Sequence, residues 1–159
     1  MKKILTAIVC LISVASAVAE SGQFESTSGG IVTTTTNDYG NSKYSITNVI
    51  YSNRVINSNV SFLPVGTMSV SQCLGIVTVE NSVISGSGAC MASDTDGDKW
   101  RLNYVRGDST PQSVTGTADF IGLSGKFANA KGPCTYDQKR LVKDGVVHVT
   151  TLLKCSVSK

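Results

Sequence analysis

The sequence predicts an all-β protein, a single antiparallel, roughly eight-stranded up-and-down barrel. From residue 30 onward, β-branched runs of Val, Ile and Thr alternate with turns of Gly, Asn, Asp and Ser. No stretch keeps an apolar period of 3.6 residues, so crossover helices are absent and neighbouring strands should be antiparallel. The connections are short and almost regularly spaced, which is typical of a barrel or a sandwich.

The first 19 residues of the 159-residue chain are expected to be a cleaved signal peptide. Lys2 and Lys3 precede an apolar run over residues 4–15, and Ala17-Val18-Ala19 has the small-x-small pattern of a cleavage site. This run is shorter than the about 20 apolar residues of a membrane span. We therefore expect an exported protein, secreted or periplasmic, without membrane contact after cleavage.

Two domain boundaries follow from the remaining composition. The polar residues 20–29 are expected to be a flexible lead-in, and residues 30–159 the barrel domain. Without the two lysines of the signal peptide, 12 of the 14 basic residues stand against 11 acidic ones, a formal charge of +1. A nearly neutral surface argues against nucleic acid or an anionic membrane as the main partner.

Each predicted strand ends at a residue type that favours turns. Gly40, Asn81-Ser82, Asp94–Asp98 and Asp144-Gly145 separate β-branched or glycine-rich runs, and Pro64 marks a longer loop. The eight expected strands cover residues 30–37, 43–56, 68–79, 83–93, 99–105, 114–121, 134–142 and 146–157.

Four of the five cysteines lie beyond the signal peptide, and an even number in an exported chain indicates two disulfides. A hairpin centred on Asn81-Ser82 places Cys73 opposite Cys90, and one centred on Asp144-Gly145 places Cys134 opposite Cys155. Directly opposed residues lie within disulfide reach, so we predict the pairs Cys73–Cys90 and Cys134–Cys155. A zinc site is disfavoured, because the chain has no Cys-x-x-Cys pair and one histidine.

The same register argument predicts which face of the sheet lies inside. A hairpin centred on Asp96-Gly97 sets Leu102 opposite Met91, and Tyr104 opposite Ala89. The interior face would then carry Leu74, Ile76, Met91, Trp100, Leu102 and Tyr104. Cys73 and Cys90 would lie on the outer face, as an external clip.

The alternate carboxylates Asp94, Asp96 and Asp98 resemble the start of a calcium-binding EF-hand loop. That loop needs glycine at its sixth position and glutamate at its twelfth, where this chain has Lys99 and Val105. A polar hairpin turn is therefore the preferred interpretation, with a calcium site at the three aspartates as the alternative.

No catalytic constellation is visible. His148 is expected on the exposed side of its strand, without an orienting partner for general-base chemistry. The serines near glycines, Ser85, Ser87 and Ser124, do not form a nucleophile elbow, and Asp119 has no evident carboxylate partner. We therefore lean against an enzyme and expect no cofactor. Trp100, Tyr104, Phe120 and Phe127 either line a ligand cavity or fill a solid core, since eight-stranded barrels do both.

The segment Leu123-Ser-Gly-Lys-Phe-Ala-Asn-Ala-Lys-Gly132, which ends in a strand with Tyr136, is predicted to be the corner that closes the barrel. It resembles a glycine-rich signature of exported bacterial proteins related to the allene oxide cyclase-like, calycin-like barrel. The resemblance extends to Cys73-Leu-Gly75, Gly86-Ser-Gly-Ala-Cys90 and the aspartates of residues 94–98. It implies an eight-stranded barrel and no particular activity, because no functional residue of that family matches position by position.

Three function classes remain. The preferred one is an exported barrel that binds a small apolar ligand. The alternatives are a secreted surface-interaction or inhibitor protein with a solid barrel, and a cyclase- or dirigent-like enzyme that acts through the shape of its cavity. The expected partner is accordingly a small apolar molecule or an extracellular protein, and the sequence leaves the oligomeric state open.

Overall fold

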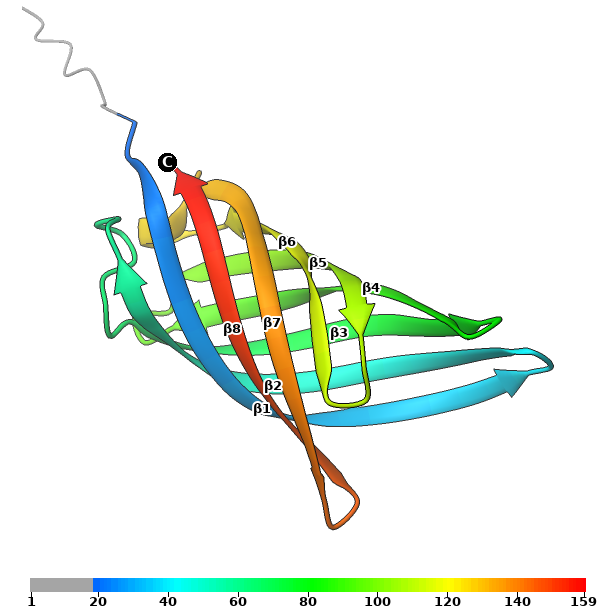
Figure 1. Ribbon diagram of the computed structural model, residues 1–159. Coiled ribbons are helices and arrows are strands. Elements are labelled where there is room, and N and C mark those ends of the chain that lie inside the picture. The colour runs from blue at the N-terminus through cyan, green and yellow to red at the C-terminus, as the bar shows by residue number, and fades with distance from the viewer. Residues whose placement is uncertain (1–18) are drawn as a thin grey trace, which may run out of the picture.

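The computed structural model describes residues 19–159, which form a closed, antiparallel eight-stranded barrel in the simple order β1 to β8 (Figure 1). The predicted fold class is confirmed. The predicted signal peptide lies, except for Ala19, outside the described residues. Within the described part, no helix is long and apolar enough to cross a membrane. The strands are β1 (Ser21–Tyr39), β2 (Ser42–Ser58), β3 (Met68–Glu80), β4 (Val83–Asp94), β5 (Lys99–Ser109), β6 (Ser113–Gly122), β7 (Lys131–Lys143) and β8 (Val146–Ser158).

Two tight turns set the register of the hairpins that carry the cysteines. Asn81 and Ser82 have φ angles of 49° and 67°, and the Asp144-Gly145 turn has two positive φ angles as well. Such two-residue turns match the right-handed twist of a hairpin and insert no bulge between the paired residues of the two strands. The opposed pairs are therefore Cys73–Cys90 and Cys134–Cys155. Both predicted disulfides are present.

The first strand begins well before its expected start. Of residues 20–29, expected to be a flexible lead-in, those from Ser21 onward pair with β8 and those from Phe24 onward also pair with β2, which closes the barrel. Phe24 is buried, and Ser26 is buried as well beside a register shift at Glu25. The expectation was wrong because this strand turns serines, instead of apolar residues, toward the barrel interior, so its alternation resembles that of a loop.

The predicted inner face is correct for β5 and reversed for β3 and β4. Trp100 and Leu102 are buried, but Leu74, Ile76 and Met91 are about half exposed. The disulfide Cys73–Cys90 lies inside the barrel, with its cysteines 4% and 8% exposed, and is not an external clip.

The reversal comes from a register difference of one residue between β4 and β5. Cys90, not Met91, is opposite Leu102, because Ser93 pairs with Lys99 and leaves five residues in the turn. The axis of this hairpin passes through Asp96, whereas the prediction placed it between Asp96 and Gly97. In a strand, a shift of one residue moves every side chain to the other face.

The two ends of the barrel differ. The hairpins β1–β2, β3–β4 and β7–β8 extend beyond the barrel body at one end, which we call the hairpin end (Figure 1). At the other end, the loop of residues 59–67 and the corner of residues 123–130 fold inward. These two segments bury Val60, Phe62, Leu63, Phe127 and Ala130. We call this end the plugged end.

The corner closes through backbone contacts that only a glycine permits at its start. The N–H of Gly122 donates to the carbonyl oxygen of Ala130 at 2.7 Å, and the N–H of Ala130 donates to that of Phe127 at 2.9 Å. A side chain at Gly122 would overlap the Phe127 carbonyl oxygen. Asn129 of the corner adopts a φ of 70°, which asparagine tolerates better than most residues. The short helix Gly125–Phe127 (η1) thus carries Phe127 into the core.

We predict that Gly122→Ala destabilises the protein by about 1–3 kcal/mol, the usual range for overpacking a closed site. The added Cβ must displace the backbone that carries Phe127. The matched control is Gly29→Ala, where a Cβ meets nothing within 4 Å and a change within about 1 kcal/mol is expected. Urea unfolding of both variants measures the difference, and equal stabilities would contradict this account of the corner.

Candidate functional site

The barrel encloses a cavity of about 340 Å³ between the plugged end and the hairpins. We call it the lumen cavity. Trp100 and Tyr104, two of the four aromatic residues predicted to line a cavity, contribute to its wall. Phe120 lies deeper, stacked on Trp100 with ring centroids 5.4 Å apart, and Phe127 is completely buried in the plug. The barrel is therefore solid at one end and hollow at the other, and the four aromatics divide between the two.

The deep wall of the lumen cavity is apolar. It is built by inward-facing residues of β2, β5 and β8 and by one of the disulfides, namely Val49, Leu102, Leu153 and Cys73–Cys90. These side chains are at most 8% exposed. A ligand that reaches this wall would exchange water for hydrocarbon.

Two tyrosines cross the lumen wall over glycines. A side chain at Gly75 or Gly88 would overlap the Tyr104 hydroxyl, and one at Gly116 would overlap the ring of Tyr136. The two rings meet edge to face, with centroids 6.3 Å apart. Because these glycines have no side chains, the aromatic rings can lie against the neighbouring strands instead of projecting into the cavity.

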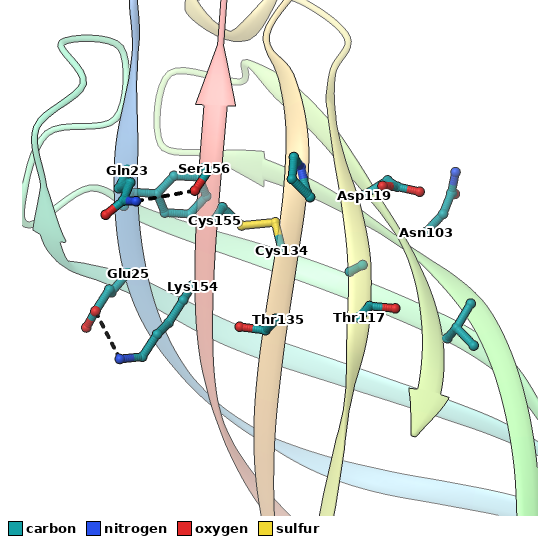
Figure 2. A pocket seen from close by; sticks show the side chains of 14 residues that line it. Gln23, Glu25, Asn103, Thr117, Asp119, Cys134, Thr135, Lys154, Cys155 and Ser156 are labelled. Atoms are coloured by element: carbon teal, nitrogen blue, oxygen red, sulfur yellow. Dashed lines mark hydrogen bonds and ion pairs between the residues drawn. A yellow bond between two sulfur atoms is a disulfide. The ribbon is translucent and has the colours of Figure 1, made fainter. Parts of the chain in front are cut away.

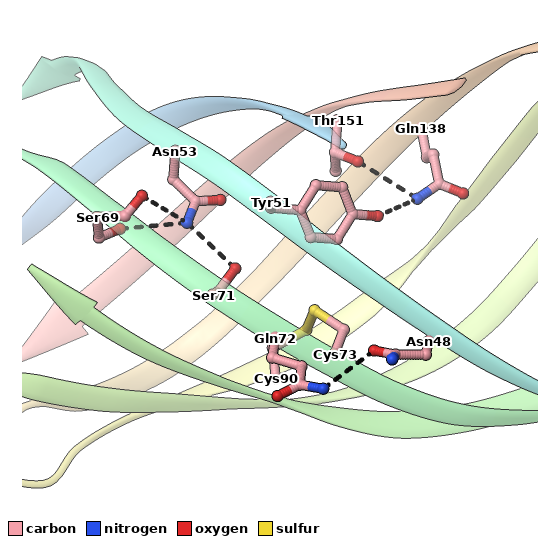
Figure 3. The surroundings of a disulfide bond; sticks show 10 residues. All are labelled: Asn48, Tyr51, Asn53, Ser69, Ser71, Gln72, Cys73, Cys90, Gln138 and Thr151. Carbon is pink, nitrogen blue, oxygen red and sulfur yellow. Dashed lines mark hydrogen bonds between the residues drawn. A yellow bond between two sulfur atoms is a disulfide. The ribbon is translucent and has the colours of Figure 1, made fainter. Parts of the chain in front are cut away.

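The polar side chains of the lumen form two hydrogen-bonded groups (Figure 3). The Gln138 amide donates to the Tyr51 hydroxyl at 2.6 Å and lies 3.4 Å from the Thr151 hydroxyl. Nearer the plug, the Asn53 amide donates to the Ser71 hydroxyl at 3.1 Å and to the Ser69 hydroxyl at 3.2 Å.

Burial changes the acidity of the tyrosines. It raises the pKa of Tyr51 and of Tyr104, and it raises that of Tyr136 to about 12, with a smaller contribution from Tyr104. All three hydroxyls therefore keep their protons at neutral pH. The Tyr136 hydroxyl donates to the Val105 carbonyl oxygen at 3.3 Å, and none of the three is an activated base.

Two arginines, Arg106 of β5 and Arg140 of β7, also line the lumen cavity. Burial lowers the pKa of both guanidinium groups, and for Arg106 the nearby charge of Arg140 lowers it further. Neither arginine was among the residues predicted from the sequence to line a cavity. The signal was present in β5, because alternation places Arg106 on the same face as Trp100, Leu102 and Tyr104.

The three aspartates of the β4–β5 turn hold an internal cation instead of forming an open metal site. The Asp94 carboxylate accepts hydrogen bonds from the N–H groups of Asp96 and Asp98, both at 3.0 Å. The Lys126 ammonium lies 2.6 Å from Asp94 Oδ2 and 2.7 Å from Asp96 Oδ2. Asp98 accepts a hydrogen bond from the backbone N–H of Lys126 at 3.0 Å. Among residues 19–159, no group of three His, Cys, Asp or Glu side chains is placed to hold a metal ion.

These contacts, which we call the aspartate–lysine lock, shift the pKa values of their members. Desolvation on its own would raise the pKa of Asp94, but the hydrogen bonds from Lys126 and from two backbone N–H groups lower it below its ordinary value. The Asp94 and Asp96 carboxylates raise the pKa of Lys126 to about 12. Both residues are therefore charged over a wide pH range.

Most of the remaining candidate residues lie away from the lumen, and among the serines Ser87 is one of the residues that line the lumen cavity. His148 is exposed on the outer side of β8, as predicted, and Asp119 is exposed on the outer side of β6. The Ser124 hydroxyl accepts a hydrogen bond from the Lys99 N–H at 2.9 Å and so serves the corner. Ser85 and Ser87 are exposed.

A second, shallower depression of about 450 Å³ lies on the outside of the barrel, across β1, β8, β7, β6 and β5 (Figure 2). Its side chains are mostly exposed, and its one ion pair joins Glu25 to Lys154 at 3.1 Å. The polar groups there are spread along five strands and do not converge on one point (Figure 2). The lumen cavity is the better candidate site, because it is more enclosed and its polar groups converge.

We predict that Lys126→Met destabilises the protein by about 2 kcal/mol, because it leaves the buried Asp94 carboxylate without its cation. The control is Lys43→Met, which removes an ion pair to Asp38 with both side chains more than 60% exposed. That change should stay within about 0.5 kcal/mol. Urea unfolding at neutral pH makes the comparison, and equal effects of the two substitutions would mean that the lock does not stabilise the barrel.

The lock also predicts a pH dependence with a definite sign. A carboxyl with a lowered pKa contributes stability above its ordinary value of 3.8 and loses it as the pH falls through the folded value. The contribution of Lys126 to stability is complete below pH 10.5, the ordinary pKa of lysine, and is lost as the pH rises through about 12. The stability difference between wild type and Lys126→Met should therefore shrink in acid. A difference that stays constant between about pH 6 and about pH 2 would contradict this assignment.

Comparisons with known proteins do not assign this barrel to a family. The closed eight-stranded barrel is compatible with a calycin-like fold, but no family model, no curated protein and no solved structure matches the chain. The allene oxide cyclase-like resemblance therefore stands on its motifs alone.

Proposed function

We propose that this protein is a binding module that holds one small, mainly apolar ligand in the lumen cavity. The observation that carries the proposal is a hollow of about 340 Å³ inside a barrel whose other end is packed solid. Small-molecule sites typically start at about 300 Å³ and combine apolar walls with a few placed polar groups. The lumen cavity has both properties.

The side chains of the wall leave the lumen cavity open. Tyr104 and Tyr136 lie flat over glycines instead of pointing across the cavity. The side chains of Tyr51, Gln138 and Thr151 hold one another through hydrogen bonds. Because these groups are fixed in advance, a ligand would not have to order them, which lowers the entropic cost of binding.

The setting of such a module is extracellular or periplasmic. The two disulfides agree with an oxidising compartment, where structural disulfides persist. The signal-peptide pattern of residues 1–19 adds to this inference.

A surface-interaction protein is the second candidate, because the outer face of β2 and β3 exposes apolar residues. Ile46 is paired with Ile76, and Ile50 and Leu74 lie on the same outer face. Each is more than half exposed. Exposed apolar patches often mark interaction sites, but this interpretation leaves the lumen cavity without a role.

We predict that the neutral fluorescent probe N-phenyl-1-naphthylamine binds the wild-type protein with one site per chain. Val77→Trp should abolish this binding, because Val77 lines the lumen cavity and the larger ring fills it. The matched control is Ile76→Trp, at the neighbouring position on the outer face, which should bind the probe as wild type does. Circular dichroism checks that both variants fold.

The result that would overturn the proposed function is equal binding to wild type and Val77→Trp, or no binding to any of the three proteins. Loss of binding in Ile76→Trp alone would instead favour the outer apolar face as the site. Native mass spectrometry of protein purified from its producing cells gives an independent readout, since a bound small molecule adds a discrete mass to the chain.

A further inference from the structure

Two guanidinium groups face the lumen cavity from strands on either side of β6. Arg106 lies opposite Gly116 of β6, and the backbone N–H of Arg140 donates to the Gln112 carbonyl oxygen at 2.8 Å. Both side chains are half-buried, and both line the cavity. On β7 the residue opposite Gly116 is Tyr136, and the charge of Arg140 lies near enough to lower the pKa of Arg106.

Neither arginine has an acidic partner. Every ion pair within residues 19–159 is formed by a lysine, and none of the described residues that line the lumen cavity is Asp or Glu. The Arg106 Nε atom is buried and has no hydrogen-bond partner in the described part of the chain. The neutral contacts of the two groups are the Ser109 hydroxyl for Arg106 and the Gln138 side-chain oxygen, 3.5 Å away, for Arg140.

This arrangement is unfavourable while the cavity holds no anion. Removing a charge from water is costly unless an opposite charge or several hydrogen bonds replace the hydration. Here two like charges share one half-enclosed space, and the pKa of Arg106 is lowered by burial and by Arg140. Guanidinium groups nevertheless stay protonated at neutral pH, so both remain donors.

The surroundings favour an acidic group over any other. None of the described residues that line the lumen cavity is a carboxylate, and the Tyr51 hydroxyl, which accepts a hydrogen bond from Gln138, keeps its own proton at neutral pH. Guanidinium groups bind carboxylates and sulfonates through paired, charge-assisted hydrogen bonds. Below them lies the apolar wall of Trp100, Leu102 and Leu153.

We propose that the lumen cavity binds an amphipathic anion, with a carboxylate or sulfonate held by Arg106 and Arg140 and an apolar body directed toward Trp100. This inference rests on the proposed function and specifies its ligand class. It assigns a charge to the ligand that the sequence analysis expected to be purely apolar.

The test compares two probes that share one ring system. 8-Anilinonaphthalene-1-sulfonate carries a sulfonate, and N-phenyl-1-naphthylamine is the same molecule without it. The sulfonate probe should bind wild type more tightly than the neutral probe does. In the variant Arg106→Gln/Arg140→Gln its affinity should fall about 10- to 100-fold, the usual weight of charge-assisted hydrogen bonds. The affinity of the neutral probe should stay within about twofold, because its apolar contacts are unchanged.

The control is Arg54→Gln, which removes one guanidinium charge from an exposed position on β2 and should alter neither affinity. If the double variant loses both probes equally, or the sulfonate probe binds it as it binds wild type, the acidic-group inference is wrong and the binding proposal stands. Failure of both probes to bind wild type would overturn both proposals.

A second measurement uses wild type alone and does not depend on the variants folding. Added sodium chloride should lower the affinity of the protein for the sulfonate probe and leave its affinity for the neutral probe unchanged. Salt screens the attraction between charges and does not screen apolar contacts. The same weakening for both probes, or for neither, would contradict a charged site. Loss of sulfonate-probe binding in Val77→Trp locates the site in the lumen cavity, and retention would place it elsewhere and overturn the inference.

Discussion

The aspartate–lysine lock is the contact on which the shape of the barrel depends. It joins the β4–β5 turn to the β6–β7 corner, two segments about 30 residues apart in sequence, and Lys126 is followed directly by Phe127. Because Phe127 and Ala130 help to fill the plugged end, the lock holds in place one of the two segments that close the lumen there. Two of the motifs that carry the family resemblance, the aspartate turn and the glycine-rich corner, are thus in direct contact.

What the sequence could predict depends on how locally each register is set. Two-residue turns with positive φ angles fix their own hairpins, so both disulfides followed from counting residues on either side. The aspartate turn has five residues, and its geometry is held by the Asp94 carboxylate and by Lys126 from another hairpin. A local pattern carries no information on such a tertiary contact, and the resulting shift of one residue reversed the faces of β3 and β4.

The candidate site was harder to predict than the fold, because a hollow barrel does not alternate cleanly. Where the interior is a cavity, inward positions carry serine, asparagine or arginine, as at Ser28, Asn53 and Arg106. These positions look solvent-exposed in sequence, which is why the start of β1 resembled a loop and both lumen arginines were passed over. Of the four aromatic residues that could line a cavity or fill a solid core, Trp100 and Tyr104 line the lumen, and the sequence had no signal that separates them from Phe120 and Phe127.

The division into a solid and a hollow half explains how the protein tolerates two uncompensated arginines. Phe24, Phe120, Phe127 and the disulfide Cys134–Cys155 are buried in the solid half. Their packing, with the lock, stabilises the closed barrel independently of the cavity. The hollow half can then keep an electrostatically unfavourable pair of charges, which an anionic ligand would neutralise. A ligand that binds only the folded chain also stabilises it by mass action, and because the same eight strands run through both halves, that stabilisation extends to the whole barrel.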